Sequence, residues 1–170
     1  MTAGQASDEI RRAVEDKVKS INQQVRSRGT RVAKALRSAE LDVLEGERSG
    51  KVYRVPDTYG QKPNDATREL MKEYRHKLRD GQLYRASAPG EAPASRNGDL
   101  REHWAEGVDS GNSSNSSGGN TVSVVAYIES QEEYADYLEN GKGMAPRPFV
   151  ERIKEKAKPE IEKILKEPYT

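Results

Sequence analysis

The strongest pattern in the chain is an apolar stripe near the N-terminus. Between residues 7 and 45, apolar side chains recur at intervals of mostly three and four, with charged residues between them: Ile10, Val14, Val18, Ile21, Val25, Val32, Leu36, Ala39 and Val43. This spacing predicts one long amphipathic helix over residues 1–46, with Ser7 as N-cap and Gly46 as terminator. Gly29 is the weak point of this helix, where we expect it to hinge or split.

A helical segment and a hairpin are predicted in the middle of the chain. Residues 51–55 are a short extended run. Apolar spacing predicts a helix over about 66–80, inside an inserted segment at 57–83. The β-branched run 121–128 is the clearest strand, and we expect it to form a hairpin with 104–108. The Ser, Gly and Asn residues between these strands, at 110–120, predict a mobile hairpin tip.

The last part of the chain predicts an arm, an elbow and a helix. Residues 84–98 are rich in Pro and Gly, and 86–94 have few means of folding on themselves; they are either an arm that docks on an adjacent protomer or an ordinary surface loop. Pro146 and Pro148 restrict the backbone to a rigid elbow. The helix that follows keeps apolar residues in helical register from Phe149 to Leu165, and Pro159 predicts a kink.

These elements predict an α+β fold in one domain, residues 1–170. The long N-terminal helix and the C-terminal helix pack on one face of a small, mostly antiparallel sheet. Residues 99–170 supply the sheet and the last helix. Two strands alone are not stable, so the sheet requires the long helix, more strands or a second subunit.

Composition favours a protein that completes its core by association. Only 33% of the 170 residues are hydrophobic and 34% are charged, so a lone monomer would have a thin core. The net charge is +1 with both signs interspersed, which excludes a large basic field for duplex DNA. The absence of Cys excludes disulfides and thiolate metal sites. No apolar run is long enough for a membrane span, and the first residues lack the apolar core of a signal peptide.

Catalytic chemistry has no carrier in the sequence. His76 and His103 lie 27 residues apart without a second ligand at helical spacing. Neither a nucleophile motif, a zinc motif nor a phosphate-binding glycine loop is present. With 28 acidic residues, neighbouring carboxylates such as Glu132 and Glu133 are expected by chance. We therefore expect no enzyme, no cofactor and no metal.

One locally basic face stands out on the first helix, between residues 26 and 37. It is either a solvated flank or a surface for nucleic acid or an acidic partner. Its candidate DNA-facing residues are Arg26, Arg28, Arg31, Lys34 and Arg37.

Three uncommon segments arrive in one order. Residues 84–94, containing "SAPGEAPA", are followed by "NGDLR" at 97–101. The segment "YADYLENG" at 134–141 comes after the Val-rich strand, and "MAPRPF" at 144–149 opens the last helix. Together they resemble the tail-component family of tailed bacteriophages, the small neck or tail-completion proteins of long-tailed phages. The similarity spans about 84–165, and Asn97, Asn140 and Lys142 depart from the family's usual residues.

The resemblance implies a structural virion protein at the head–tail junction, made in the bacterial host cytoplasm. Its copies would form a ring of six, or of twelve, between the head connector and the tail terminator or tail tube. The ring would surround DNA without sequence specificity, hold no cofactor and touch no membrane. The interface candidates are Ala88, Pro89, Gly90, Glu91, Pro93, Tyr134, Tyr137, Leu138, Glu139, Pro146, Arg147, Pro148 and Phe149. For Tyr134, Tyr137 and Leu138, closing the domain's own core is the alternative role.

The alternative function is a nucleic-acid-associated adaptor that uses the basic face of residues 26–37. A third interpretation, an enzyme working through surface carboxylates, is remote. Defined multimers would favour the ring protein, whereas a monomer that binds DNA with a steep salt dependence would favour the adaptor.

Overall fold

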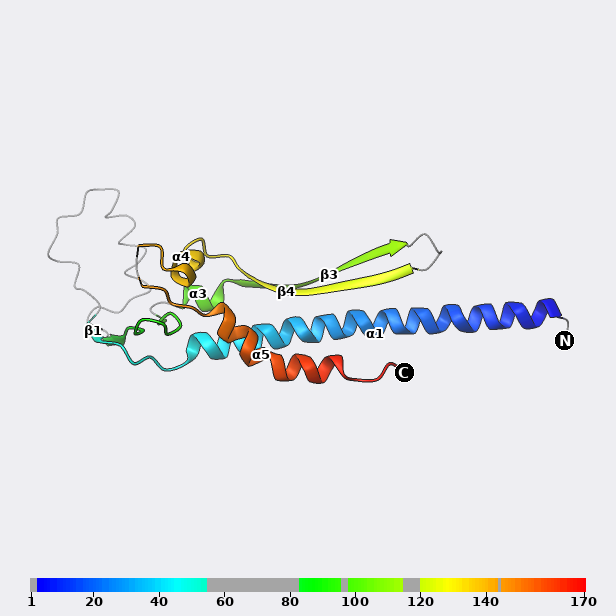
Figure 1. Cartoon of the computed structure of the whole chain (residues 1–170), viewed down its shortest axis with the longest axis horizontal. Helices are drawn as coiled ribbons and strands as arrows, with labels where there is room; N and C mark the ends of the chain where they lie inside the picture. Colours follow the sequence, from blue (N-terminus) through cyan, green and yellow to red (C-terminus); the bar gives the residue numbers. More distant parts are fainter. Residues whose placement is uncertain (1–2, 55–82, 96–97, 115–119, 144) are drawn as a thin grey trace. The chain divides into compact units, whose positions relative to one another are not determined.

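The computed structural model describes residues 3–54, 83–95, 98–114, 120–143 and 145–170. Their elements, in chain order, are α1 (Ala3–Glu45), β1 (Val52–Arg54), β2 (Leu83–Arg85), α3 (Asp99–Glu102), β3 (Trp104–Ser114), β4 (Asn120–Ser130), α4 (Ala135–Asn140) and α5 (Val150–Leu165) (Figure 1). The α+β class is confirmed, with a long N-terminal helix, a C-terminal helix and small antiparallel pairing. The helix predicted at 66–80 and the centre of the predicted hairpin tip, 115–119, lie outside the described residues.

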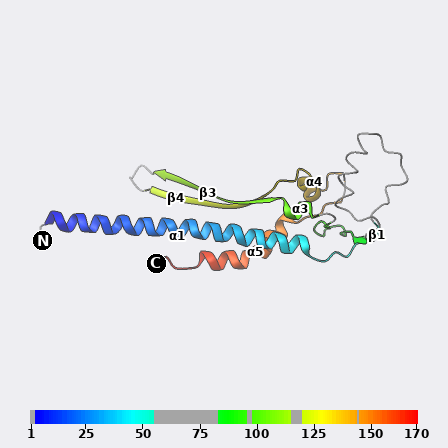
Figure 2. The ribbon, with the colours of Figure 1, turned by 180° about the vertical axis from the view of Figure 1, so that it is seen from behind.

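The chain forms two compact units. The hairpin unit comprises residues 1–38, 105–129 and 157–170, and the elbow unit comprises residues 39–104 and 130–156. Both α1 and α5 contribute residues to each unit. In the hairpin unit, β3–β4 and residues 157–170 lie along different sides of α1 (Figure 1, Figure 2).

α1 runs without a break through Gly29, so the predicted hinge or split is wrong. Gly29 is buried against the hairpin. A Cβ built there would overlap Val124 Cγ1 and lie 3.1 Å from Val108 Cγ1. Because Gly29 has no side chain, β3 and β4 can approach α1 closely at this position. The stability gained from this tertiary contact outweighs the poor helix propensity of glycine.

The predicted hairpin is confirmed, but its strands are longer than expected. β3 continues through the Ser- and Gly-containing residues 109–114 that were predicted to belong partly to the tip. Cross-strand pairing satisfies backbone groups whatever the side chains are, which explains the extension. In β4, Val122, Val124, Ala126 and Ile128 are half-buried and alternate with exposed residues, as one covered strand face requires. We call the covered side the inner face and the other side the outer face.

The short extended run at 51–55 is confirmed as a strand at Val52–Arg54. It pairs antiparallel with β2, with Val52 opposite Arg85 and Arg54 opposite Leu83. This two-stranded ladder fixes the start of the Pro/Gly-rich segment relative to the end of α1.

The core of the elbow unit forms around Phe149, which is 1% exposed. The Trp104 ring meets it edge to face, with 6.1 Å between ring centroids and an interplanar angle of 83°. Ile153 and Leu44 are also buried. Farther along, α5 continues through Pro159, so the proline does not end the helix.

Candidate functional site

The Pro/Gly-rich segment folds back on itself in a turn after β2. The Glu91 amide donates to the Ala88 carbonyl at 3.1 Å, which closes a four-residue turn over Pro89 and Gly90. Gly90 has a φ of 81°, and proline followed by a glycine with positive φ is the pattern of a type II turn. Residues 86–94 were expected to have few means of folding on themselves, and this turn is one that they do form.

The Glu91 carboxylate ties this turn to the segment after α1. It accepts hydrogen bonds from the Ser49 hydroxyl at 2.5 Å, the Ser49 amide at 3.1 Å and the Ala88 amide at 2.7 Å. These donors, the Ser49 hydroxyl foremost, lower the pKa of Glu91 to about 2. The carboxylate is thus committed to holding its own chain together.

Three arginines donate to carbonyl groups of the same segment. Arg48 donates to the Pro93 carbonyl at 2.9 and 3.0 Å, and burial lowers the pKa of its guanidinium. Arg147 reaches the Ser87 carbonyl at 2.6 Å. Arg152 reaches the Gly90 carbonyl at 2.7 Å. Ala92 and Pro93 are buried.

Arg48, Ser49 and Arg152 were missed by the sequence analysis. The signal that could have found them is the set of carbonyl groups in residues 86–94. This segment forms no regular strand pairing, so its carbonyl groups need donors from elsewhere in the chain. Since the donors come from the same chain, these carbonyl groups are satisfied without an adjacent protomer, which favours the surface loop over the docking arm.

The elbow is held from α4. The Glu139 carboxylate accepts from the amides of Phe149, at 2.7 Å, and Val150, at 3.2 Å, and so satisfies the first amides of α5. The Arg147 amide donates to the Leu138 carbonyl at 2.7 Å. In addition, the Gly90 amide donates to the Pro146 carbonyl at 3.2 Å.

The structure therefore brings most of the predicted interface residues together inside the elbow unit. Phe149 and Pro93 are buried, and Ala88, Glu91, Leu138, Glu139, Arg147 and Pro148 are half-buried. The residues that remain exposed are Pro89, Gly90, Tyr134, Tyr137 and Pro146. Tyr137 is 45% exposed, with the Lys142 ammonium 4.8 Å from its ring centroid.

Part of the predicted basic face binds the C-terminal residues of the chain. Arg28 is 6% exposed, donates to the Pro168 carbonyl at 2.8 Å and lies 3.8 Å from the centroid of the Tyr169 ring. One turn before it, the Gln24 amide group exchanges hydrogen bonds with the backbone of Thr170, at 2.6 and 3.1 Å. Arg28 is consequently not available to a phosphate.

Arg31 forms a two-bond ion pair with Glu167, with both N–O distances at 2.5 Å. This hydrogen-bonded pair raises the pKa of Arg31 and lowers that of Glu167. Arg37 is half-buried. Of the five residues, Arg26 and Lys34 are therefore the two that are exposed and that the C-terminal residues do not bind. The five residues do not form one open basic surface.

The N-terminal third of α1 carries an exposed apolar stripe, at Ile10, Val14 and Val18, which we call the N-terminal stripe. These side chains are 66%, 58% and 44% exposed. Apart from Ala6, every residue from Gly4 to Lys19 is exposed. In the sequence these three residues share the periodicity of the rest of the apolar stripe. The length of the pattern distinguishes these three residues from the covered part of the stripe. Toward the N-terminus, the pattern extends beyond the residues of α1 that the hairpin and the C-terminal segment contact.

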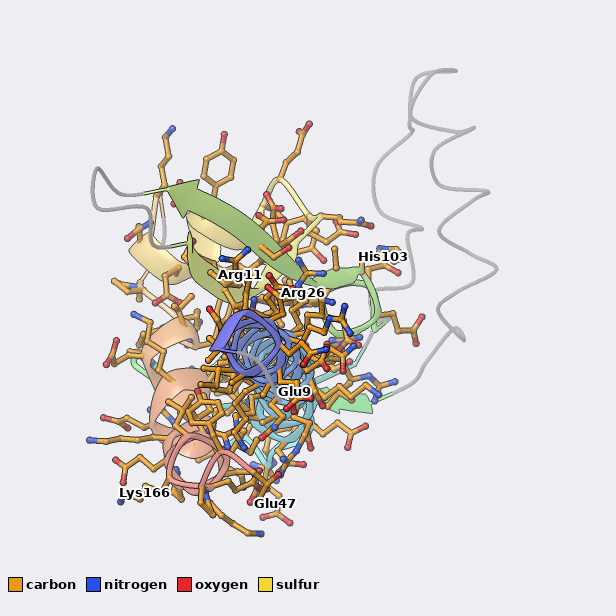
Figure 3. All side chains as sticks on the ribbon, turned by 90° about the vertical axis from the view of Figure 1, so that its right-hand side faces the viewer. Glu9, Arg11, Arg26, Glu47, His103 and Lys166 are labelled. Carbon is orange, nitrogen blue, oxygen red and sulfur yellow. The ribbon has the colours of Figure 1, made fainter. Side chains whose placement is uncertain are left out.

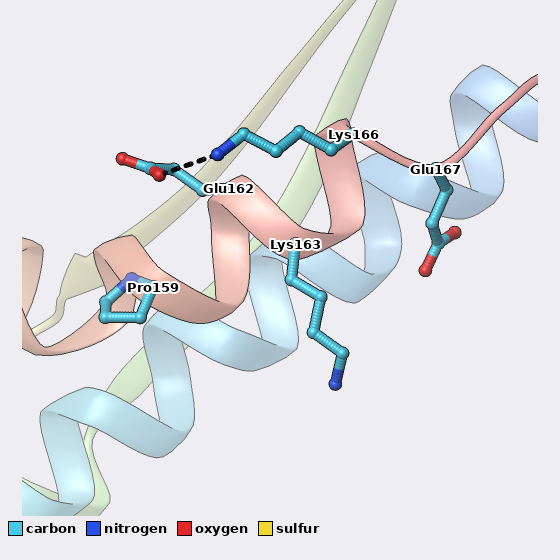
Figure 4. A pocket seen from close by; sticks show the side chains of 5 residues that line it. All are labelled: Pro159, Glu162, Lys163, Lys166 and Glu167. Carbon is cyan, nitrogen blue, oxygen red and sulfur yellow. Dashed lines mark hydrogen bonds and ion pairs between the residues drawn. The ribbon is translucent and has the colours of Figure 1, made fainter.

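A shallow depression near the end of α5 is lined by Pro159, Glu162, Lys163, Lys166 and Glu167 (Figure 4). Lys166 pairs there with Glu162 at 3.2 Å, an ordinary helical ion pair.

In the part of the chain that the structure describes, no His, Cys, Asp and Glu cluster is suited to a metal ion. None of the described helices combines the length and apolar character that a membrane crossing needs. His103 binds the Glu132 carboxylate across the base of the hairpin, and His76 lies outside the described residues. No protein-family model, curated protein or solved structure matches this chain.

Proposed function

We propose that this chain is a structural subunit of a tailed-phage virion, whose copies form a ring at the head–tail junction. Such a ring joins the head connector to the tail tube and surrounds the DNA channel. The phage assignment rests on the resemblance of residues 84–101, 134–141 and 144–149 to the tail-component family.

The observation that supports a self-assembling role is the N-terminal stripe. Amphipathic helices in folded proteins normally cover their apolar side, and most of their stability comes from that packing. Here the side is covered from Val25 to Leu36 and exposed from Ile10 to Val18. Exposed apolar side chains in a row are typical of a surface that a partner covers.

The alternative, an adaptor that binds nucleic acid through residues 26–37, has less support. Arg28 and Arg31 are engaged by the C-terminal residues. Binding of duplex DNA without sequence preference depends on many phosphate contacts, and two engaged arginines reduce the number this face offers.

Native mass spectrometry and negative-stain imaging of the purified full chain test the proposal. We expect one closed multimer, with six or twelve copies and an axial opening. The matching control is DNA binding in low salt, measured by fluorescence anisotropy. A monomer that binds duplex DNA with a steep salt dependence would reject the ring in favour of the adaptor.

A further inference from the structure

The outer face of the β3–β4 hairpin is a second apolar surface of the hairpin unit. Val125 is 60% exposed and Tyr127 is 37% exposed. The Tyr127 ring lies over Gly107 on the neighbouring strand, where a Cβ would be 2.5 Å from the Tyr127 hydroxyl oxygen. Because Gly107 has no side chain, the Tyr127 ring fits over this position of the neighbouring strand.

This outer face is acidic at its margins. Asp109 is two residues beyond Gly107 on β3, and Glu129 is two residues beyond Tyr127 on β4, so both lie on the same face as the ring. Both are exposed. Neither forms an ion pair with another residue in the described part of the chain.

The N-terminal stripe has the opposite charge at its margins. On a helix with about 100° per residue, Arg11 flanks the stripe on one side and Lys17 on the other. Figure 3, viewed along α1 from its N-terminus, shows Arg11 on the side of α1 turned toward the hairpin and Glu9 on the opposite side. Glu15 flanks Val14 and Val18 in the same way as Arg11 flanks Ile10 and Val14, so the charges beside the stripe are Arg11, Glu15 and Lys17, with basic residues in excess.

We infer that the N-terminal stripe of one copy binds the outer face of the β3–β4 hairpin of the next copy. The inference rests on the proposed ring and adds the two surfaces that close it. The apolar pair Val125 and Tyr127 extends over about 7 Å of strand, and residues 10–18 extend over about 12 Å of helix, so the N-terminal stripe is long enough to cover both apolar side chains and to reach the acidic residues beside them. Arg11 and Lys17 then lie near Asp109 and Glu129.

The contact joins the N-terminal stripe of one copy to the outer face of the next. Each added copy therefore still has one of its two surfaces free to bind a further copy. Such a contact is heterologous, and it closes into a ring when the rotation that relates one copy to the next closes on itself. Pairing of two stripes with each other would close a dimer instead. It would also bring the Arg11 and Lys17 side chains of both copies together, which like-charge repulsion disfavours.

Cysteine cross-linking of the full chain tests the inference, because the natural chain has no Cys. Val14→Cys chains are mixed with Val125→Cys chains and oxidised, and the products are separated by mass. We expect the mixed dimer to exceed each like–like dimer at least fivefold. The matched control is Glu9→Cys, on the opposite side of α1, which should give little mixed dimer with Val125→Cys.

A charge exchange supplies a second, independent readout. The double variant D109K/E129K should lower the fraction of multimer at least tenfold, and adding R11E/K17E in the same chain should restore it. All four positions are exposed, so far-UV circular dichroism should be unchanged.

The outcomes separate this inference from the proposed function. Two results would overturn the inference and leave the ring proposal standing, provided that multimers persist. In the first, V14C chains cross-link mainly to each other. In the second, Glu9→Cys gives as much mixed dimer with Val125→Cys as Val14→Cys does. Failure of the charge exchange to restore multimers would also overturn it. A wild-type chain that stays monomeric at every concentration would overturn both.

Discussion

Gly29 of α1 lies in direct contact with the Val124 side chain of β4, so closely that a methyl group on Gly29 would overlap the Val124 Cγ1 atom. Gly29→Ala gains about 1 kcal/mol of helix propensity but forces the hairpin away. We expect a net destabilisation of about 1–2 kcal/mol, measured by urea unfolding followed by far-UV circular dichroism.

The control for Gly29→Ala is Gly4→Ala. Gly4 is exposed on the same helix, and a Cβ there meets nothing within 4 Å. This variant should be neutral or slightly stabilising. If Gly29→Ala were as stable as Gly4→Ala, the close packing of α1 on the hairpin would be disproved.

Removal of the Phe149 ring should destabilise the elbow unit strongly. Phe149→Ala leaves a cavity beside Trp104 and is expected to cost about 3–5 kcal/mol. Trp104 is the single Trp of the chain, so its fluorescence reports on this unit. Val150→Ala, at the exposed neighbouring position, should cost less than about 1 kcal/mol. Equal losses in the two variants would contradict the assigned core.

The Glu91 carboxylate should make the stability of the turn depend on pH. Its pKa is about 2 in the folded chain, against an ordinary value of 4.5. A lowered pKa stabilises the fold fully above pH 4.5, and this stabilisation is lost as the pH falls toward 2. Wild type should therefore exceed Glu91→Gln in stability at pH 7, and the difference should disappear toward pH 2.

Urea titrations of wild type and Glu91→Gln at several pH values measure this difference. Glu47→Gln is the control, because Glu47 is exposed and the structure assigns it no such set of donors. A wild-type advantage that stayed constant from pH 7 to pH 2 would refute the role given to the ionised carboxylate.

The contact between Tyr169 and Arg28 should hold the C-terminal residues on α1. Tyr169→Leu removes the ring from above the guanidinium and should lower stability by about 1 kcal/mol. Tyr169→Phe keeps the ring and should behave like wild type. Thermal unfolding measures both, and a Tyr169→Phe variant as unstable as Tyr169→Leu would show that the ring face is not the reason.

The sequence allowed the long helix, the hairpin and the last helix to be predicted, because each has a local signature. The apolar stripe of α1 repeats every three or four residues, and the β-branched run of β4 is continuous. Local signatures do not show what comes near an element from far along the chain. Gly29 was therefore interpreted as a weak point, when it is a packing site for Val108 and Val124.

The candidate residues show the same limit more strongly. The choice between a docking arm and a surface loop stayed open for the Pro/Gly-rich segment, because Arg48 and Arg152 lie 45 and 62 positions from the carbonyl groups that they bind. Arg28 was a candidate for a DNA contact or for a solvated flank, because nothing near it in sequence indicated that Pro168 and Tyr169 bind it. Long-range hydrogen bonds of this kind have no periodic signal.

The most direct test of the self-assembly claim is sedimentation velocity of wild type and Val14→Asp over a wide concentration range. Val14 is exposed, so the aspartate should leave the circular dichroism of the fold nearly unchanged. We predict that wild type sediments as a single closed multimer and that Val14→Asp sediments as a monomer. A wild-type chain that remains monomeric throughout, or a Val14→Asp chain that assembles as well as wild type, would contradict the account.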